Sequence, residues 1–136
     1  MAINVEDEIE FCFFEAKKRF KFLLDLGFRD AIPKSGGLWG SLLYRGDKVT
    51  ISVQFELLEF FVFFTVCPAG KEGWHSQIHL VEILQQLYLD QDYDNKLRAL
   101  RGDLKNCGEF LDIYVFALRE NFTKIIENFD LIFIGK

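Results

Sequence analysis

The chain has 136 residues, half of them hydrophobic and 16 of them Phe, and it carries a formal net charge of −5 at pH 7. Its length is that of one domain, and its aromatic content supplies enough apolar surface for a large core, which excludes intrinsic disorder. The negative charge argues against general binding to nucleic-acid phosphate, because such binding is carried by basic surfaces. We therefore expect one domain over residues 1–136 and no nucleic-acid partner.

The sequence has neither the pattern of a secretory signal or membrane span nor a spacing of cysteines that suggests disulfides. The chain begins MAINVEDEIE, which is acidic where a secretory signal is basic, and its longest charge-free run spans only residues 60–70. A membrane-spanning helix needs roughly 20 apolar residues. Cys12, Cys67 and Cys107 are odd in number and widely spaced. We expect a cytoplasmic protein that does not enter the membrane, with buried free thiols rather than disulfides or zinc ligands.

The N-terminal segment has the period of an amphipathic helix. From Val5 to Leu24 most apolar residues recur three or four positions apart. Asn4 can cap the start and Gly27 can end the helix, while acidic residues gather early and basic residues late, as the helix dipole favours. The pattern predicts a helix from residue 4 to residue 26.

The next segment changes to the period of a strand. Four apolar residues alternate with polar ones, which predicts a strand with one solvated face: Val49, Ile51, Val53 and Phe55. Gly46-Asp47 has the chemistry of a two-residue type II′ hairpin, whereas Gly36-Gly37 indicates a looser connection. These signals predict an antiparallel meander of three or four strands.

The stretch FELLEFFVFF, residues 55–64, is unusually rich in Phe. In a strand from residue 60 to residue 67 both faces would be apolar, with Pro68 ending it. We expect helices to cover one face and another element or another subunit to cover the second, since exposed Phe rings on an edge invite aggregation. Leu57 and Leu58 fall in the preceding turn, where we expect them to be exposed.

The C-terminal half is predicted to be helical. Residues 76–89 place apolar side chains on one helical face, and residues 108–129 have the period of a long third helix. Residues 131–136, LIFIGK, read as a short strand or a tail. Together the elements predict an α+β fold, with an N-terminal helix, an antiparallel β-meander and C-terminal helices packed on the sheet.

Two clusters of potential metal ligands occur in the sequence, one of histidines and one of aspartates, and neither matches a known metal-binding motif. His75, His79 and Glu82 would share one helical face, but the H-E-x-x-H zinc motif needs Glu directly after the first His, where Ser76 stands. A solvated polar face explains this cluster better. We therefore expect no metal and no cofactor, and we assign no catalytic residue.

The acidic run DQDYDN offers Asp90, Asp92 and Asp94 at the spacing of calcium-loop ligands. Asn95 and Arg101 occupy the positions at which that loop needs Gly and Glu, so an acidic loop facing a basic partner explains the run better. GGLWG, residues 36–40, lacks the ending of a phosphate-binding loop and reads as turn chemistry.

FKFLLDLGF, LLYRGDKVTISVQF and FFVFFTV, within residues 20–66, together resemble a pattern in small bacterial immunity proteins encoded beside polymorphic toxins. The chain differs from that pattern at the turn ELLE, which is usually polar. The resemblance implies a cytoplasmic, non-catalytic protein that occludes a cognate toxin. An acidic charge suits a basic toxin such as a nuclease. The expected partner-binding residues are Leu57, Leu58, Asp90, Asp92 and Asp94.

Two other functions stay open. In the first, the protein is a structural or adaptor protein whose Phe-rich strand is buried in a homodimer. In the second, it is an enzyme that uses His75 or the carboxylates Glu109 and Asp112 in a pocket. Neighbouring genes separate the immunity function from both alternatives, and a mass measurement in solution tests the homodimer.

Overall fold

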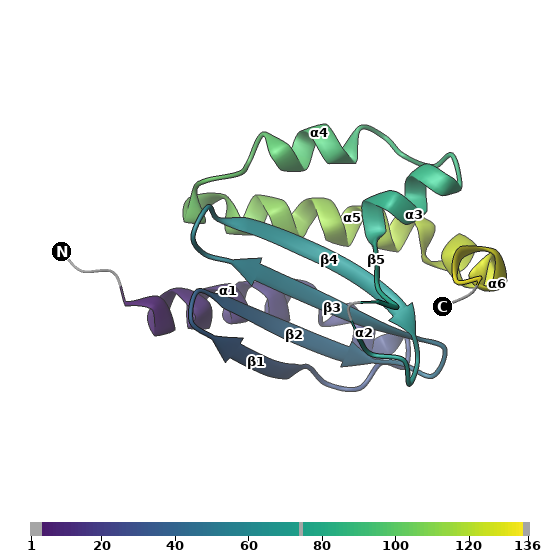
Figure 1. The fold of residues 1–136 in the computed structure, drawn as a ribbon, viewed down its shortest axis with the longest axis horizontal. Coiled ribbons are helices and arrows are strands. Elements are labelled where there is room, and N and C mark those ends of the chain that lie inside the picture. Colours follow the sequence, from purple (N-terminus) through teal and green to yellow (C-terminus); the bar gives the residue numbers. More distant parts are fainter. Residues whose placement is uncertain (1–3, 74, 135–136) are drawn as a thin grey trace.

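The computed structural model describes residues 4–73 and 75–134, and it confirms the α+β fold (Figure 1). A five-stranded antiparallel sheet has the order β1-β2-β3-β4-β5. Its strands are β1 (Ile32–Gly36), β2 (Trp39–Arg45), β3 (Val49–Glu56), β4 (Phe61–Pro68) and β5 (Ile78–His79). The α-helices are α1 (Val5–Arg19), α2 (Phe22–Asp25), α3 (Leu80–Gln86), α4 (Tyr93–Arg98), α5 (Cys107–Glu127) and α6 (Phe129–Ile132), and a 3-10 helix, η1, spans Leu104–Asn106.

The helices are distributed unevenly about the sheet. Figure 1 shows α1 behind the sheet and α5 running along the β4 edge, while α3 and α4 lie beyond that edge. The core lies between the sheet and the α1–α5 layer, where the Phe64 ring lies 5.5 Å from both the Phe20 and the Tyr114 rings. Among the described residues no helix covers the opposite side of the sheet, which we call the open face.

The N-terminal helix begins as predicted and ends earlier. The Asn4 side chain accepts a hydrogen bond from the Glu6 amide at 2.9 Å, which confirms the cap. The helix breaks after Arg19, and α2 follows as a separate turn that ends before Gly27 at φ 95°. Phe20 and Leu23 are both fully buried on either side of the break. The single helix expected over residues 4–26 is therefore wrong: the chain forms two helices, and the break allows both side chains to be buried.

Both hairpin predictions are wrong in detail. The Gly46 amide donates to the Val49 carbonyl at 3.0 Å, so Asp47 and Lys48 form the centre of that turn, and Gly46 has no positive φ. A Cβ on Gly46 would lie 2.7 Å from the Phe28 ring, so close packing excludes a side chain there. Gly37, at φ 59°, instead begins a two-residue connection between the paired Gly36 and Trp39.

Strand β4 follows the predicted alternation. Val62, Phe64 and Val66 are buried toward the helices, and β4 ends at Pro68. Phe61 and Phe63 are half-buried on the open face, so the second face is covered only in part. Three or four strands were expected, and β5 adds a fifth.

The segment 76–89 is not one helix. Ile78 and His79 pair with Val66 and Thr65 to form β5, because the edge of β4 needs a hydrogen-bonding partner and Ile78 fills a core position. Helix α3 starts only at Leu80, and Tyr88, one of the apolar side chains of the segment 76–89, is 96% exposed.

The C-terminal elements are helical throughout the part that the structure describes. Helix α5 (Cys107–Glu127) confirms the predicted third helix. The expected strand or tail over residues 131–136 is wrong for its first part, where Leu131 and Ile132 belong to α6 and Phe133 is buried. Residues 135–136 lie outside the described residues.

The three cysteines are buried free thiols, as predicted. A hydrogen bond with Cys107, followed by burial, raises the pKa of Cys12, and burial raises the pKa of Cys67 to about 11. The thiolate is the reactive form of cysteine, so the raised pKa values keep Cys12 and Cys67 in the inert thiol form.

Candidate functional site

The open face is polar at its centre. The amide of Gln54 on β3 donates to Gln77 Oε1 at 2.9 Å, and the Thr65 hydroxyl on β4 donates to the same oxygen at 2.8 Å. A shallow hollow of about 340 Å³ lies over these strands, lined by Lys34, Trp39, Ser41, Leu43, Ser52, Gln54, Thr65, Cys67, Glu72, Gly73 and Gln77. The alternation predicted for β3 therefore places a hydrogen-bonded polar surface on the open face, which no helix of the described residues covers.

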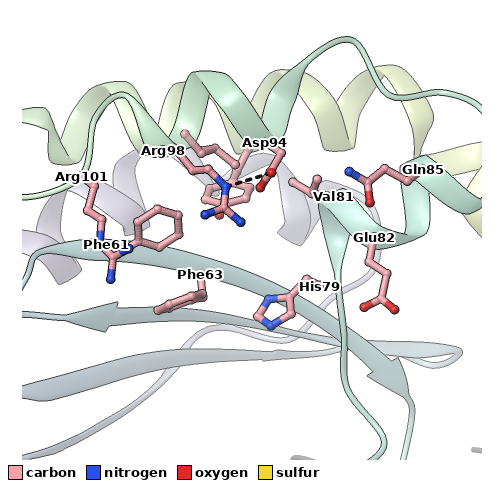
Figure 2. Close-up of a pocket in the computed structure, with 11 residues that line it drawn as sticks. Phe61, Phe63, His79, Val81, Glu82, Gln85, Asp94, Arg98 and Arg101 are labelled. Atoms are coloured by element: carbon pink, nitrogen blue, oxygen red, sulfur yellow. Dashed lines mark hydrogen bonds and ion pairs between the residues drawn. The ribbon is translucent and has the colours of Figure 1, made fainter.

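A larger cleft of about 580 Å³ lies where the open face meets α3 and α4 (Figure 2). Its volume is within the range of small-ligand and side-chain pockets. It is lined by Phe61, Phe63, His79, Val81, Glu82, Gln85, Asp94, Leu97, Arg98, Arg101 and Tyr114. We call it the aromatic cleft.

The floor of the aromatic cleft consists of rings from two adjacent strands. Phe61 and Phe63 lie on the same face of β4, with ring centroids 4.7 Å apart. His79 on β5 pairs with Thr65 on β4, and its imidazole lies 5.7 Å from the Phe63 ring. Phe61 also packs edge-on against the buried Phe110, at 5.0 Å. This contact anchors the floor to α5.

The walls of the cleft carry charged side chains. Arg98 Nε donates to Asp94 Oδ2 at 2.9 Å within α4. Arg101 forms an ion pair with Glu59 and lies over the Phe61 ring at 5.9 Å. On the α3 wall the Glu82 side chain has no ion pair or hydrogen bond to any described residue. The charges of the two arginines are thus compensated within the protein, and the charge of Glu82 is not.

The edge of β4 beside the cleft is closed to strand addition. Strand β5 pairs only with Thr65 and Val66, which leaves the first half of β4 without a neighbouring strand on that side. The Tyr114 hydroxyl donates to the Val62 carbonyl at 2.7 Å, and the Gly102 amide donates to the Phe60 carbonyl at 2.9 Å. These contacts occupy backbone acceptors that an incoming strand would need. A ligand must therefore be recognised here by side chains.

The turn predicted to bind a partner is only partly exposed. Leu58 is 75% exposed, but Leu57 is half-buried and packs against the core, so the expectation that both are exposed is wrong for Leu57. The Leu57 amide donates to the Leu38 carbonyl at 2.9 Å, which holds the two turns together. Leu38 and Trp39 are 45% and 48% exposed at this end of the sheet. We call Leu38, Trp39 and Leu58 the apolar tip.

Sequence reasoning missed Leu38 and Trp39. Their segment, GGLWG, was interpreted as turn chemistry alone. The pairing of Trp39 with Glu56 could not be seen before the hairpin register was known, and that pairing brings the segment beside Leu57 and Leu58.

The three predicted aspartates do not form one site. Asp90 accepts a hydrogen bond from the Tyr93 amide at 3.1 Å, and Asp92 accepts one from the Asn95 side chain at 2.7 Å. Asp94 alone lines the aromatic cleft, where it pairs with Arg98. Asp90 and Asp92 thus form hydrogen bonds at the start of α4, and only Asp94 contributes a carboxylate to the cleft.

The histidine cluster expected on one helical face is not formed. His79 lies in β5 and Glu82 in the first turn of α3, while His75 precedes the strand. The strand pairing of Ile78 and His79 overrides the helical period there. Within residues 4–73 and 75–134 no three His, Cys, Asp or Glu side chains gather as metal ligands.

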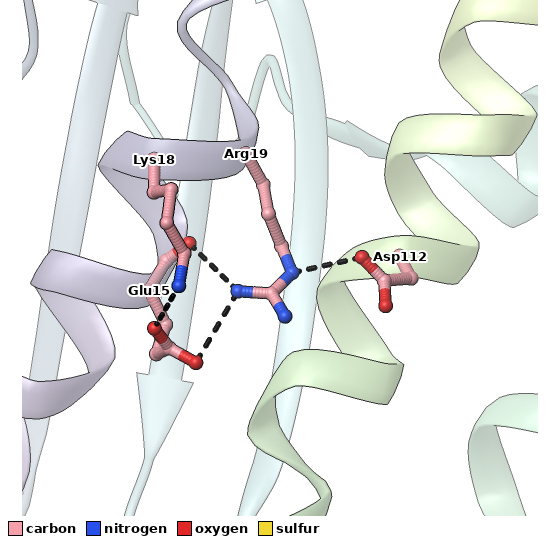
Figure 3. Close-up of polar contacts among 4 residues, drawn as sticks. All are labelled: Glu15, Lys18, Arg19 and Asp112. Carbon is pink, nitrogen blue, oxygen red and sulfur yellow. Dashed lines mark hydrogen bonds and ion pairs between the residues drawn. The ribbon is translucent and has the colours of Figure 1, made fainter.

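The carboxylates Glu109 and Asp112 line neither the aromatic cleft nor the shallow hollow. Figure 3 shows Asp112 on α5 accepting a hydrogen bond from Arg19 Nε on α1, at 2.8 Å. Arg19 also pairs with Glu15, whose carboxylate is bound by Lys18 as well. The hydrogen bond from Lys18 leads the contacts that lower the pKa of Glu15. This network joins the two helices of the core layer.

No helix in the described part of the chain has both the length and the hydropathy of a membrane span. Comparisons with family models, with curated proteins and with solved structures give no match. The open face, the aromatic cleft and the apolar tip are the surfaces from which a function can be proposed.

Proposed function

We propose that the protein is a non-catalytic binding domain of the cytoplasm that captures another protein on its open face. The aromatic cleft carries this proposal. Its half-buried Phe61 and Phe63 are flanked by Arg98 and Arg101 on a face that no described helix covers. Aromatic residues and Arg are the residue types enriched at the centres of protein interfaces, where most of the binding energy is concentrated.

The cleft and the apolar tip belong to one surface. Phe61 on β4 pairs with Glu56 on β3, and Glu56 pairs with Trp39 on β2. The three residues therefore form a row on the same face of the sheet. Neighbouring strands lie about 4.8 Å apart, which puts Phe61 and Trp39 roughly 10 Å from each other. A partner protein can therefore contact both features at once.

The class of partner follows from charge and from the resemblance. The net charge of −5 favours association with a basic protein, and the pattern in residues 20–66 resembles immunity proteins encoded beside toxins. We propose a basic toxin as the partner, which the open face occludes. The proposal assigns no catalytic residue, metal or cofactor.

A co-expression experiment tests this function. The protein is produced together with the product of the adjacent gene, and growth and complex formation are measured. We expect growth to be restored and a stable complex to form. Trp39→Ser should weaken the complex at least tenfold if Trp39 lies at the interface centre. Phe14→Ser, which changes a 65% exposed ring on α1, is the matched control.

Two results would contradict the proposed function. One is an adjacent gene product that neither binds the protein nor arrests growth. The other is a complex weakened by Phe14→Ser and unchanged by Trp39→Ser, which would move the binding surface to the helical layer.

The apolar tip also supports a second candidate, a homodimer. Exposed Leu38, Trp39 and Leu58 offer an apolar surface that a second copy of the chain can bury. Sedimentation equilibrium distinguishes a 15.9 kDa monomer from a dimer of twice that mass. A dimer that dissociates in Trp39→Ser would favour this candidate, and a monomer at all concentrations would exclude it.

A further inference from the structure

We propose that the aromatic cleft receives a Lys or Arg side chain, held between the Phe63 ring and the Glu82 carboxylate. The inference rests on the proposed function for the source of that side chain, a basic protein partner. Beyond the proposed function, it specifies what the cleft binds: one cationic side chain.

The charges around the cleft favour a cation over an anion. Arg98 is paired with Asp94 and Arg101 with Glu59, so the positive charge of the walls is already neutralised by the protein. The Glu82 side chain has no partner among the described residues, so the cleft has one net negative charge when Glu59, the partner of Arg101, is counted with the lining residues and His79 is neutral. An incoming carboxylate would meet arginines whose charge is already paired and would be repelled by Glu82. A cation breaks no existing pair.

The floor offers the second half of the site. A cation over an aromatic face is attracted by the quadrupole of the ring. Arg101 already occupies such a position over Phe61, at 5.9 Å, whereas no described cation lies over Phe63. Phe61 and His79 meet the Phe63 ring at tilted angles of 48° and 49° rather than stacked on it.

The two halves lie on the same side of the cleft. Figure 2 shows His79 between Phe63 and Glu82, with the Glu82 carboxylate directed downward at the level of the imidazole. A Lys or Arg side chain can lay its apolar stem along the Phe61 and Phe63 rings and bring its charged end to Glu82. The volume of about 580 Å³ accommodates such a side chain together with water.

A peptide titration followed by NMR tests the site without any protein partner. The probe is acetyl-Gly-Arg-Gly-amide at low ionic strength, compared with the same peptide carrying Gln or Glu in place of Arg. We expect saturable shifts of the Phe63 and His79 ring signals with the Arg peptide, and weaker or no binding of the other two.

Variants assign the two contacts separately. Glu82→Gln should weaken binding of the Arg peptide about threefold, through loss of an exposed ion pair. Phe63→Leu keeps an apolar side chain but removes the ring face, and it should also weaken binding about threefold. Glu127→Gln removes the same charge from the far end of α5 and should leave the affinity unchanged. Thermal unfolding verifies that each variant is folded.

Three results would overturn the inference. These are equal or tighter binding of the Gln or Glu peptide, no saturable shift with the Arg peptide, and unchanged affinity in both Glu82→Gln and Phe63→Leu. The outcomes separate the inference from the proposed function. A cleft that binds the Arg peptide in a protein without a protein partner contradicts only the proposed function. A partner that binds these two variants as tightly as the original protein contradicts only the inference.

Discussion

The hydroxyl group of Tyr114 on α5 donates a buried hydrogen bond of 2.7 Å to the carbonyl oxygen of Val62 on β4. The bond joins two elements far apart in the sequence and satisfies a backbone acceptor at the strand edge. Tyr114 also lines the aromatic cleft, so the same bond fixes the position of α5 beside Phe61 and Phe63. A single hydroxyl thus supports the core and the candidate site together.

Replacement of Tyr114 by Phe should lower the free energy of unfolding by about 1 to 3 kcal/mol, because the Val62 carbonyl loses its buried donor. Thr50→Val is the control, since the Thr50 hydroxyl is buried with no hydrogen-bond partner among the described residues. That change should be neutral or stabilising. Urea denaturation of the three proteins measures both effects. Equal stability of Tyr114→Phe and the original protein would show that the bond contributes nothing.

Alkaline pH should unfold the protein through its buried tyrosines. Burial raises the pKa of Tyr44, Tyr93 and Tyr114 above the usual value near 10. The unfolded chain therefore loses these protons at lower pH than the folded chain. Their contribution to stability is complete below about pH 10 and is lost as the pH rises toward the folded-state values.

Absorbance of tyrosinate and circular dichroism, followed together from pH 8 upward, measure this effect. We expect most of the tyrosinate signal to appear together with the loss of secondary structure. Ionisation of all tyrosines near pH 10 in a protein that keeps its helical signal would contradict the burial of these three side chains.

The two hairpin glycines should respond differently to substitution. Gly46→Ala should destabilise the protein by about 1 to 3 kcal/mol, because the added Cβ would lie 2.7 Å from the Phe28 ring and 2.8 Å from the Val49 carbonyl oxygen. Gly37→Asn should cost much less, since Asn tolerates the positive φ of 59° and a Cβ there meets nothing within 4 Å. Thermal unfolding ranks the two variants. If Gly37→Asn destabilised the protein more than Gly46→Ala, the close packing described at Gly46 would be wrong and the expected type II′ turn would again be the better description.

The elements with strong periodicity were predictable from the sequence. The alternation of Val49, Ile51, Val53 and Phe55 with polar residues defined β3, although its polar face is half-buried or, at Thr50, buried rather than solvated, and the helical period over residues 108–129 located α5. The α+β fold follows from these segments. Local residue pattern is sufficient there because each segment buries one continuous apolar face.

The remaining features depend on tertiary contacts. Ile78 and His79 have a helical neighbourhood in sequence and become a strand because β4 offers them an edge. The aromatic cleft combines β4, β5, α3 and α4, whose approach no local pattern encodes. Phe61 and Phe63 were recognised as a second apolar face, but not as a floor beneath Arg98 and Glu82. Of the five predicted partner-binding residues, only Asp94 lines the cleft and only Leu58 belongs to the apolar tip.

Truncation of the Phe-rich strand should separate core from surface. Phe64 is 1% exposed and packs against Phe20 and Tyr114, so Phe64→Ala should cost about 3 to 5 kcal/mol. Phe61→Ala should cost about half as much, because its ring is half-buried. Leu58→Ser should change the free energy of unfolding by less than about 0.5 kcal/mol, since the side chain lies in solvent.

Leu57→Ser completes the series and tests the corrected position of that residue. Leu57 packs against the core, so its replacement should destabilise the protein measurably, unlike the adjacent Leu58→Ser. Urea denaturation gives the stability of all four variants, and sedimentation gives their association. If Leu58→Ser unfolds the chain while Phe64→Ala does not, the division into a buried strand face and an exposed apolar tip is wrong. If Leu58→Ser is stable and weakens association with a partner or a second copy, the tip is part of the contact surface.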